Sequence, residues 1–344
     1  MPDSTASTPD RIGGQLCLVT GAAGFIGSHL CERLLREGYQ VIGIDALTDS
    51  YSPELKRCNL LSLQNVAEFR LVVGDLCRMD LYPLVGRADY IFHLAGLPGV
   101  RGSFGTEFHA YVERNIIATQ RLLEVAREAP RLRKLVYASS SSVYGDNPAL
   151  PLMESSVPQP VSPYGVTKLA AEYLACLYAA NFQVPTVALR YFTVYGPRQR
   201  PDMAFHGFLR AIYADEPLRV YGDGEQTRDF TYVADVVQAN LLAMNRGRTG
   251  AVYNIAGGSR VTLNQCLEVL QRVTGRELRI VHNERQHGDV RHTYADISLA
   301  RRELGYEPRV ALEEGLAAQD KWFREVILPD CHSRASGNRE SEHF

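Results

Sequence analysis

Short apolar runs alternate with longer amphipathic segments through the first half of the chain. The apolar runs, each of strand length, cover residues 16–20, 40–45, 70–76, 90–96, 134–140 and 186–192. The segments between them, whose apolar positions recur at helical spacing, include residues 26–38, 115–129 and 164–182. Such alternation is typical of a parallel sheet with helices on both faces. The pattern therefore predicts an α/β fold with a Rossmann-type doubly wound parallel sheet.

The pattern changes beyond about Gly196, where short strands and isolated helices are separated by loops rich in Gly, Asp and Arg. This change predicts a smaller C-terminal α/β domain, with part of residues 228–255 returning to the sheet domain. Both chain ends are polar and without periodicity, which is typical of disorder. We therefore predict a disordered N-terminus at residues 1–13 and the sheet domain at residues 14–195. Residues 196–326 are predicted to form mainly the smaller domain, and residues 327–344 a flexible tail.

Composition narrows the class of protein. With 45% hydrophobic residues, a chain of 344 residues can bury a full core. The formal net charge of −2 leaves no basic excess for a phosphate backbone, so we expect no nucleic-acid partner. The sequence has no apolar run of membrane-spanning length and no signal segment at its start, so we expect no membrane partner and a cytoplasmic location. Seven cysteines spread singly favour reduced thiols and predict no metal site.

A glycine-rich turn follows the first apolar run. Thr20 is followed by GAAGFIG, which places Gly21, Gly24 and Gly27 where a helix is predicted to begin. Small residues there let backbone N–H groups approach a pyrophosphate, although a tight turn without a ligand is the alternative. Asp45 ends the next run, where a carboxylate accepts both hydroxyls of an adenosine ribose and repels a 2′-phosphate. The spacing predicts a site for NAD rather than NADP.

Two further strand ends fit the same cleft. Asp75 and Leu76 end the third run, where a carboxylate could accept from an adenine amino group. Residues 94–96 end the fourth run and are small enough to face a cofactor. His93, directly before them, is open to two interpretations, a histidine satisfied within the core or a functional one.

A tyrosine and a lysine share one helical face. Tyr164 and Lys168 lie four residues apart at the start of a predicted helix. The Lys168 ammonium and a nicotinamide cation would both favour a phenolate, lowering the pKa of Tyr164 from about 10 toward neutrality. Upstream, four consecutive serines at residues 139–142 close a strand, where ligands bind in open α/β folds. One of them could hydrogen-bond a substrate oxygen beside Tyr164, although a flexible polar loop is the alternative.

The segments GAAGFIG, GDL, HLAG, YASSSSVYG, SPYGVTK, RYFTVYGP and TRDFTYVAD occur in this order within residues 15–325. Together they resemble the extended short-chain dehydrogenase/reductase family of nucleotide-sugar epimerases, dehydratases and decarboxylases. The resemblance implies that Ser140 is the catalytic hydroxyl, that Tyr164 is the acid/base with Lys168 as its partner, and that Tyr191 lies near the nicotinamide. The predicted contacts of a tightly bound NAD are Gly21, Gly24, Phe25, Ile26, Gly27, Asp45, Asp75, Leu76, Leu94, Ala95, Gly96, Tyr164, Lys168 and Tyr191.

The residues after Ser140 distinguish subfamilies within this resemblance. Dehydratases carry Asp-Glu there and uronate decarboxylases typically carry a Glu at the second position, whereas this chain has Ser141 and Ser142. Thr193, Arg200 and the Gly-Val-Arg segment ending at Arg101 resemble the nucleotide-glucuronate 4-epimerases. These features predict a site in which Ser140, Ser141, Ser142, Thr193, Arg200 and Arg101 bind the sugar and its carboxylate. Arg228 and Asp289 are the candidates for the diphosphate and nucleotide side, with structural salt bridges as the alternative.

The resemblance implies that residues 14–195 bind NAD, that residues 196–326 mainly bind the nucleotide-sugar, and that the chain forms a homodimer through two long helices. The predicted reaction is epimerisation at C4, most simply of UDP-glucuronate to UDP-galacturonate through a 4-keto sugar. Three alternatives stay open: a uronate decarboxylase that releases CO2, a 4-epimerase of neutral sugars, and a non-catalytic NAD-binding sensor.

Overall fold

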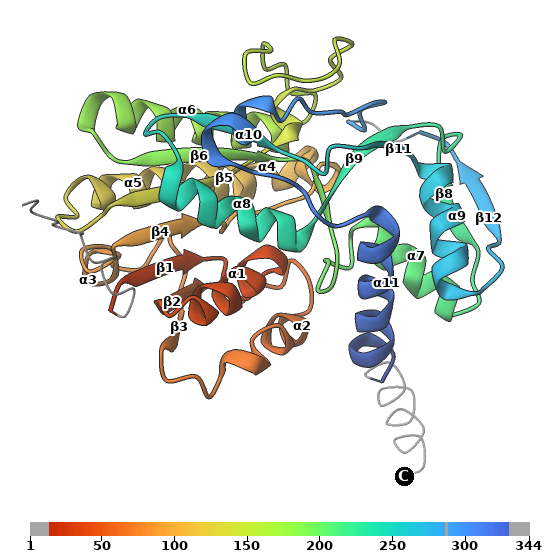
Figure 1. The fold of residues 1–344 in the computed structure, drawn as a ribbon, viewed down its shortest axis with the longest axis horizontal. Helices are drawn as coiled ribbons and strands as arrows, with labels where there is room; N and C mark the ends of the chain where they lie inside the picture. The colour runs from red at the N-terminus through yellow and green to blue at the C-terminus, as the bar shows by residue number, and fades with distance from the viewer. Residues whose placement is uncertain (1–13, 286–287, 330–344) are drawn as a thin grey trace, which may run out of the picture.

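A seven-stranded parallel sheet forms the centre of the computed structural model, which describes residues 14–285 and 288–329 (Figure 1). The spatial order of its strands is β10-β6-β5-β4-β1-β2-β3. Their bounds are β1 Leu16–Thr20, β2 Gln40–Asp45, β3 Phe69–Val73, β4 Tyr90–His93, β5 Lys134–Ser140, β6 Thr186–Tyr191 and β10 Val252–Ile255. The predicted Rossmann-type fold is confirmed. Because the strand order reverses between β1 and β4, a crevice opens at the carboxyl ends of these strands.

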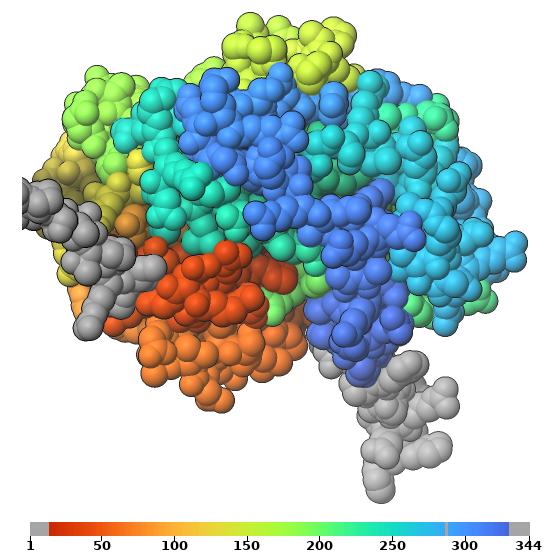
Figure 2. Space-filling model, in the orientation of Figure 1, coloured from red at the N-terminus to blue at the C-terminus, as the bar shows by residue number. Residues whose placement is uncertain are grey.

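Helices cover both faces of this sheet, and each face has its own apolar core. On one face lie α1 (Phe25–Arg36), α8 (Val233–Arg246) and α10 (Ser298–Leu304). Figure 2 shows the side chains of these three helices forming a continuous surface over the sheet. On the other face lie α3 (Tyr82–Val85), α5 (Ala118–Arg127) and α6 (Pro163–Phe182). The two-sided covering explains the nearly unbroken apolar strands of the sequence.

The second half of the chain forms a smaller unit with a third apolar core. One three-stranded sheet has the order β11-β9-β7, and β12 pairs in parallel with β8. The strands are β7 Thr193–Tyr195, β8 Leu218–Tyr221, β9 Thr227–Tyr232, β11 Arg260–Thr262 and β12 Ile280–Asn283. The helices are α7 Ala204–Tyr213, α9 Leu263–Thr274 and α11 Leu312–Trp322, which continues as a π-helical turn over Phe323–Ile327. Within residues 228–255, β9 pairs in the small sheet, whereas α8 and β10 lie on the large one.

Two helical segments beside the crevice are irregular. The helix predicted over residues 115–129 corresponds to α5 (Ala118–Arg127), and its first three residues belong to a π-helical segment (Val112–Ile117) that follows α4 (Phe108–Tyr111). Such π-helical turns are frequent at functional sites because they re-aim side chains. The short α2 (Pro53–Cys58) follows the loop after β2 and is capped by the Ser52 hydroxyl, which accepts from Leu55 N at 3.4 Å.

Candidate active site

The crevice at the carboxyl ends of the central strands is a deep cavity. The β1–α1 turn, the loops after β2, β3 and β4, and the start of α6 form its walls. Every residue predicted from the sequence to contact NAD lies in its lining, as does Arg200 from the smaller unit. The fold therefore brings the whole predicted cofactor set to one place.

The β1–α1 turn is too tight for side chains at two of its glycines. Gly21 has φ +71°, and a Cβ there would lie 2.9 Å from the backbone nitrogen of Ala95. A Cβ on Gly27 would lie 2.1 Å from the carbonyl oxygen of Gly21. Gly24 is the N-cap of α1, and no side chain caps this helix. The first N–H groups of α1 are therefore open to a phosphate, so the turn fits a dinucleotide.

The Asp45 carboxylate is held rigidly at the end of β2. Its Oδ2 accepts from Ala23 N at 3.0 Å, and its Oδ1 accepts from Leu47 N at 2.8 Å. Each oxygen keeps further lone pairs for the two hydroxyls of a ribose. The same charge disfavours a 2′-phosphate, in agreement with the predicted preference for NAD.

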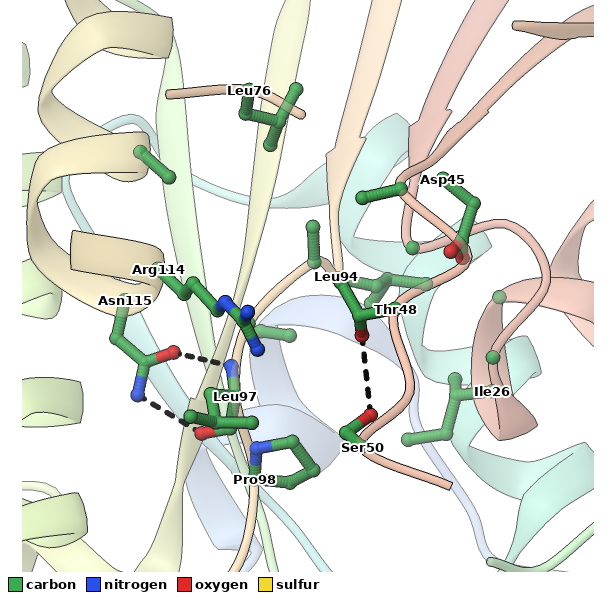
Figure 3. Close-up of a pocket in the computed structure, with 18 of the residues that line it drawn as sticks. Ile26, Asp45, Thr48, Ser50, Leu76, Leu94, Leu97, Pro98, Arg114 and Asn115 are labelled. Carbon is green, nitrogen blue, oxygen red and sulfur yellow. Dashed lines mark hydrogen bonds between the residues drawn. The ribbon is translucent and has the colours of Figure 1, made fainter. Parts of the chain in front are cut away.

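Several lining residues were not predicted. Lys56 is 5% exposed, and its ammonium donates to Thr48 O at 2.5 Å and to Ser50 Oγ at 3.3 Å, which fastens the loop after β2. Asn115 binds the loop after β4 through both its amide atoms, since Oδ1 accepts from Leu97 N at 2.7 Å and Nδ2 donates to Leu97 O at 3.1 Å (Figure 3). Asn115 carried a usable signal, because a polar amide stood on the apolar face of the predicted helix.

Arg114 extends from the π-helical segment into the same cavity (Figure 3). Across residues 14–285 and 288–329, its guanidinium has no hydrogen-bond or ion-pair partner. We expect Arg114→Gln to weaken NAD binding about tenfold, since one charge-assisted contact to a diphosphate is lost. Calorimetry with NAD, ADP-ribose and adenosine measures this, and adenosine binding is expected to stay unchanged.

Arg127→Gln is the matched control for this prediction, because it removes the same charge from the exposed end of α5. Equal losses for adenosine and NAD would contradict a diphosphate contact by Arg114.

The two predicted reacting groups lie on successive turns of α6. The helix starts with Ser162 as N-cap, whose hydroxyl accepts from Gly165 N at 3.1 Å. Lys168 is 7% exposed and donates to the carbonyl oxygen of Ala138 at 2.5 Å. Burial outweighs the opposing charge of the nearby Glu172 carboxylate, so the pKa of Lys168 is lowered to about 7.

The protein groups around the phenol of Tyr164 raise its pKa on balance. Burial raises the pKa of Tyr164 above its usual value, while the hydrogen bond with Ser140 and the charge of Arg200 lower the pKa. The ammonium of Lys168 faces Ala138 and lies 4.5 Å from the centre of the Tyr137 ring. The predicted lowering by Lys168 is therefore not found among the protein groups. Ser140, Arg200 and the positive charge of an oxidised nicotinamide are the groups that favour the phenolate.

A buried polar network lies beneath these groups. Glu172, one turn after Lys168 on α6, accepts from Arg190 Nη2 at 2.6 Å, from Arg190 Nε at 2.9 Å and from Ser139 Oγ at 2.5 Å. Arg190 also donates to the hydroxyl of Tyr144 at 2.8 Å. The network joins α6, β5 and β6 directly below Ser140.

The predicted substrate residues fall into two groups. Ser140 ends β5 and accepts from Ser142 N at 3.2 Å. Ser141 and Ser142 directly follow β5, Thr193 begins β7, and all three are half-buried. These residues border the cavity wall formed by Ala138, Ser139 and Tyr164 without being part of its lining.

The second group lies further from the sheet. Arg101 donates to Asp289 Oδ2 at 2.9 Å and lies 4.3 Å from the centre of the Tyr221 ring. Arg228 donates from Nη1 to the carbonyl oxygens of Thr227 and Arg291, at 3.0 and 3.3 Å. Arg101 and Asp289, both predicted to bind the substrate, therefore form an ion pair with each other.

Comparison with known proteins now decides the family. Residues 17–256 match the model of the NAD dependent epimerase/dehydratase family. The chain belongs to this family. The predicted NAD dependence and enzyme class are confirmed by this membership, and the non-catalytic sensor is no longer favoured.

The NAD-dependent epimerase/dehydratase resembles both uronate and neutral-sugar relatives. It is 42% identical to a crystal structure of UDP-glucuronic acid 4-epimerase from Bacillus cereus in complex with UDP-glucuronic acid and NAD, with a TM-score of 0.88 over 91% of this chain and 100% of that one. It is 37% identical to the UDP-glucuronate 4-epimerase of Thermodesulfobacterium geofontis, over 90% of this chain and 96% of the relative. It is 44% identical to the uncharacterized UDP-glucose epimerase YtcB of Bacillus subtilis, over 87% of this chain and 95% of the relative.

His93 has a structural role in this epimerase/dehydratase. It is 1% exposed, and its two ring nitrogens lie 2.8 Å from Thr20 Oγ1 and 2.9 Å from Thr119 Oγ1. Burial lowers its pKa to about 3, so the ring is neutral at physiological pH.

Across the described ranges, no group of His, Cys, Asp and Glu side chains is arranged to hold a metal. No helix within residues 14–285 and 288–329 has the length and apolar character needed to span a membrane.

Proposed function

We propose that the protein is an NAD-dependent 4-epimerase that interconverts UDP-glucuronate and UDP-galacturonate through a transient 4-keto sugar. The observation that carries the proposal is that Tyr164 and Arg200 line one cavity, close enough for the charge of Arg200 to lower the pKa of Tyr164. This cavity therefore pairs a proton-transferring group with a group that binds carboxylates. The matches to UDP-glucuronate 4-epimerases support the same reaction.

The residues of the chain divide the work of the reaction. Bound NAD supplies the redox chemistry by which the hydrogen of C4 is removed and then returned to the opposite face. Tyr164 takes the proton of the O4 hydroxyl and later returns it. Ser140, which hydrogen-bonds Tyr164, holds the same oxygen. Because the ring has to turn between the two half-reactions, most binding energy has to come from the nucleotide and diphosphate.

The sugar carboxylate has to be kept on the ring. A 4-keto uronate is a β-keto acid and loses CO2 readily, so an epimerase has to hold the carboxylate in an orientation that resists this loss. We assign this role to Ser141, Ser142, Thr193 and Arg200, none of which is a carboxylate base. A decarboxylase would use the same 4-keto sugar and let CO2 leave.

The two parts of the chain divide the ligand. We assign NAD to residues 14–195 together with α8 and β10, and the nucleotide-sugar mainly to residues 196–326. Arg228 is half-buried near Asp289 and Asp146 and is our candidate for the diphosphate. We assign Arg101 and Asp289 to the part of the site that holds the nucleotide, since their ion pair joins the loop after β4 to the smaller unit.

The neutral-sugar alternative is kept because of the match to a UDP-glucose epimerase. The test is to compare kcat/KM for UDP-glucuronate and UDP-glucose on the NAD-loaded protein. The proposal predicts a preference for UDP-glucuronate of about 100-fold, because Arg200 then has a carboxylate to bind. A preference for UDP-glucose would replace it with the neutral-sugar function.

We also propose that the protein is a cytoplasmic homodimer. Six cysteines of the described residues are free thiols, as in a reducing compartment. An apolar face is exposed along α4, the π-helical segment and α6, and consists of Phe108, Ile117, Val166, Tyr173 and Leu177, each 41–54% exposed. Two copies of this face would bury it symmetrically.

Tyr173→Glu is expected to shift the protein from dimer to monomer, because it places a charge in the centre of the proposed interface. Light scattering coupled to size exclusion measures the mass. Leu61→Glu is the control, since Leu61 is 59% exposed outside this face. A wild-type protein of monomer mass would refute the dimer.

A further inference from the structure

The guanidinium of Arg200 already holds a carboxylate that belongs to the chain. Arg200 Nε donates to Asp202 Oδ1 and Arg200 Nη2 donates to Asp202 Oδ2, both at 3.0 Å. This parallel two-bond geometry is the one by which arginine recognises free carboxylates. The donors best placed for a sugar carboxylate are therefore already in use.

The two side chains of this pair differ in their surroundings. The Arg200 side chain is 19% exposed and lines the cavity, whereas the Asp202 side chain is 55% exposed. An exposed carboxylate regains water when it leaves its partner, so its release costs little. The less exposed Arg200 guanidinium gains two charge-assisted hydrogen bonds from the pair. The pair thus keeps the arginine satisfied whenever no ligand carboxylate is present.

The backbone allows an exchange without a loop movement. Met203 N donates to Arg200 O at 3.1 Å, which closes a turn that includes both residues of the pair. Asp202 lies one residue before Met203, the N-cap of α7, and no side chain caps this helix. A carboxylate near a helix N-terminus is stabilised by the helix dipole. Rotation of the Asp202 side chain therefore gives its charge a second favourable position.

We propose that Asp202 is a specificity-determining residue: it occupies Arg200 as an internal carboxylate until the carboxylate of the sugar replaces it. The proposal rests on the proposed function, since it requires that Arg200 binds a uronate. A uronate gains the two bonds that Asp202 gives up, whereas a neutral sugar leaves the internal pair in place. Asp202 therefore weakens the binding of acidic substrates, and it keeps Arg200 neutralised when a neutral sugar is bound.

The test is a double-mutant cycle measured by calorimetry on NAD-loaded protein, in a Tyr164→Phe background that prevents turnover. Asp202→Asn is expected to tighten UDP-glucuronate binding about threefold to tenfold, because the competing charge is gone. UDP-glucose binding is expected to stay within about twofold. When Arg200 is replaced by Gln, Asp202→Asn is expected to have no further effect on UDP-glucuronate.

Glu313→Gln is the matched control, because it removes an exposed carboxylate that accepts from Arg272 at 3.0 Å away from the cavity lining. Weaker or unchanged binding of UDP-glucuronate by Asp202→Asn would overturn the proposal and make Asp202 a residue that orients Arg200. Equal tightening of both ligands would also overturn it. The Tyr164→Phe protein with Asp202 intact is measured first. If it binds UDP-glucose better than UDP-glucuronate, the proposed function fails, and this failure is distinct from a failure of the Asp202 proposal.

Discussion

Replacing Tyr164 by Phe is expected to lower kcat by at least about a thousandfold and to leave NAD bound. The phenol is the group on α6 that can take the O4 proton, and a positioned acid or base contributes about 10²–10⁴-fold. The ring itself remains in Phe, so its T-shaped contact with Tyr111, at 6.4 Å between ring centres, is kept. Turnover by coupled assay and NAD content by absorbance after desalting measure the two effects.

Tyr82→Phe is the control for the loss of a phenolic hydroxyl, since Tyr82 is 59% exposed at α3. A Tyr164→Phe protein that keeps more than about a tenth of the wild-type kcat would contradict the assignment of Tyr164 as the acid/base.

Glu172→Gln is expected to lower the free energy of unfolding by about 3–5 kcal/mol, because it leaves a buried arginine without its counter-charge. Glu172 is 1% exposed and Arg190 is 4% exposed, and their closest contact is 2.6 Å. Urea unfolding at a fixed NAD concentration measures the change, since ligand binding shifts apparent stability.

Replacing both partners of this ion pair is the informative comparison. A Glu172→Met, Arg190→Met double variant is expected to recover a large part of the loss, because no unpaired buried charge remains. Arg190 also donates to Tyr144, so recovery is expected to be incomplete. A Glu172→Gln protein as stable as the wild type would show that the network beneath Ser140 does not depend on the charge of Glu172.

The features that the sequence predicted are those that depend on local spacing. Five of the six apolar runs contain a whole strand of the large sheet, and the run at residues 70–76 overlaps the edge strand β3. Parallel strands covered on both faces are apolar on both faces. The glycine turn before α1 was readable because Gly21 and Gly27 have no room for a Cβ. Tyr164 and Lys168 share one side of α6 because four residues make about one helical turn.

The features that the sequence did not predict depend on contacts between distant segments. Lys56 reaches the cavity because its ammonium folds back onto Thr48 and Ser50, which no periodicity indicates. Arg114 is aimed inward by a π-helical turn, which sequence periodicity does not distinguish from an α-helix. The pairing of Arg101 with Asp289 joins positions 188 residues apart.

The predicted effect of Lys168 on the pKa of Tyr164 was wrong for a related reason. Spacing along α6 places Lys168 one turn away, but it does not say where the ammonium points. The ammonium donates to the carbonyl oxygen of Ala138 on β5, a contact made between elements. Two residues four apart on a helix are therefore predicted to lie on one face, but their spacing does not predict whether the charge of one shifts the pKa of the other.

The central claim is tested most directly by incubating the NAD-loaded protein with UDP-glucuronate labelled with ¹³C at C6. The sugar is followed by NMR while released CO2 is trapped. The proposed epimerase converts the substrate to UDP-galacturonate with the label retained at C6. Release of the label as CO2 would contradict the claim and make the protein a decarboxylase, and the absence of any conversion would contradict a uronate substrate.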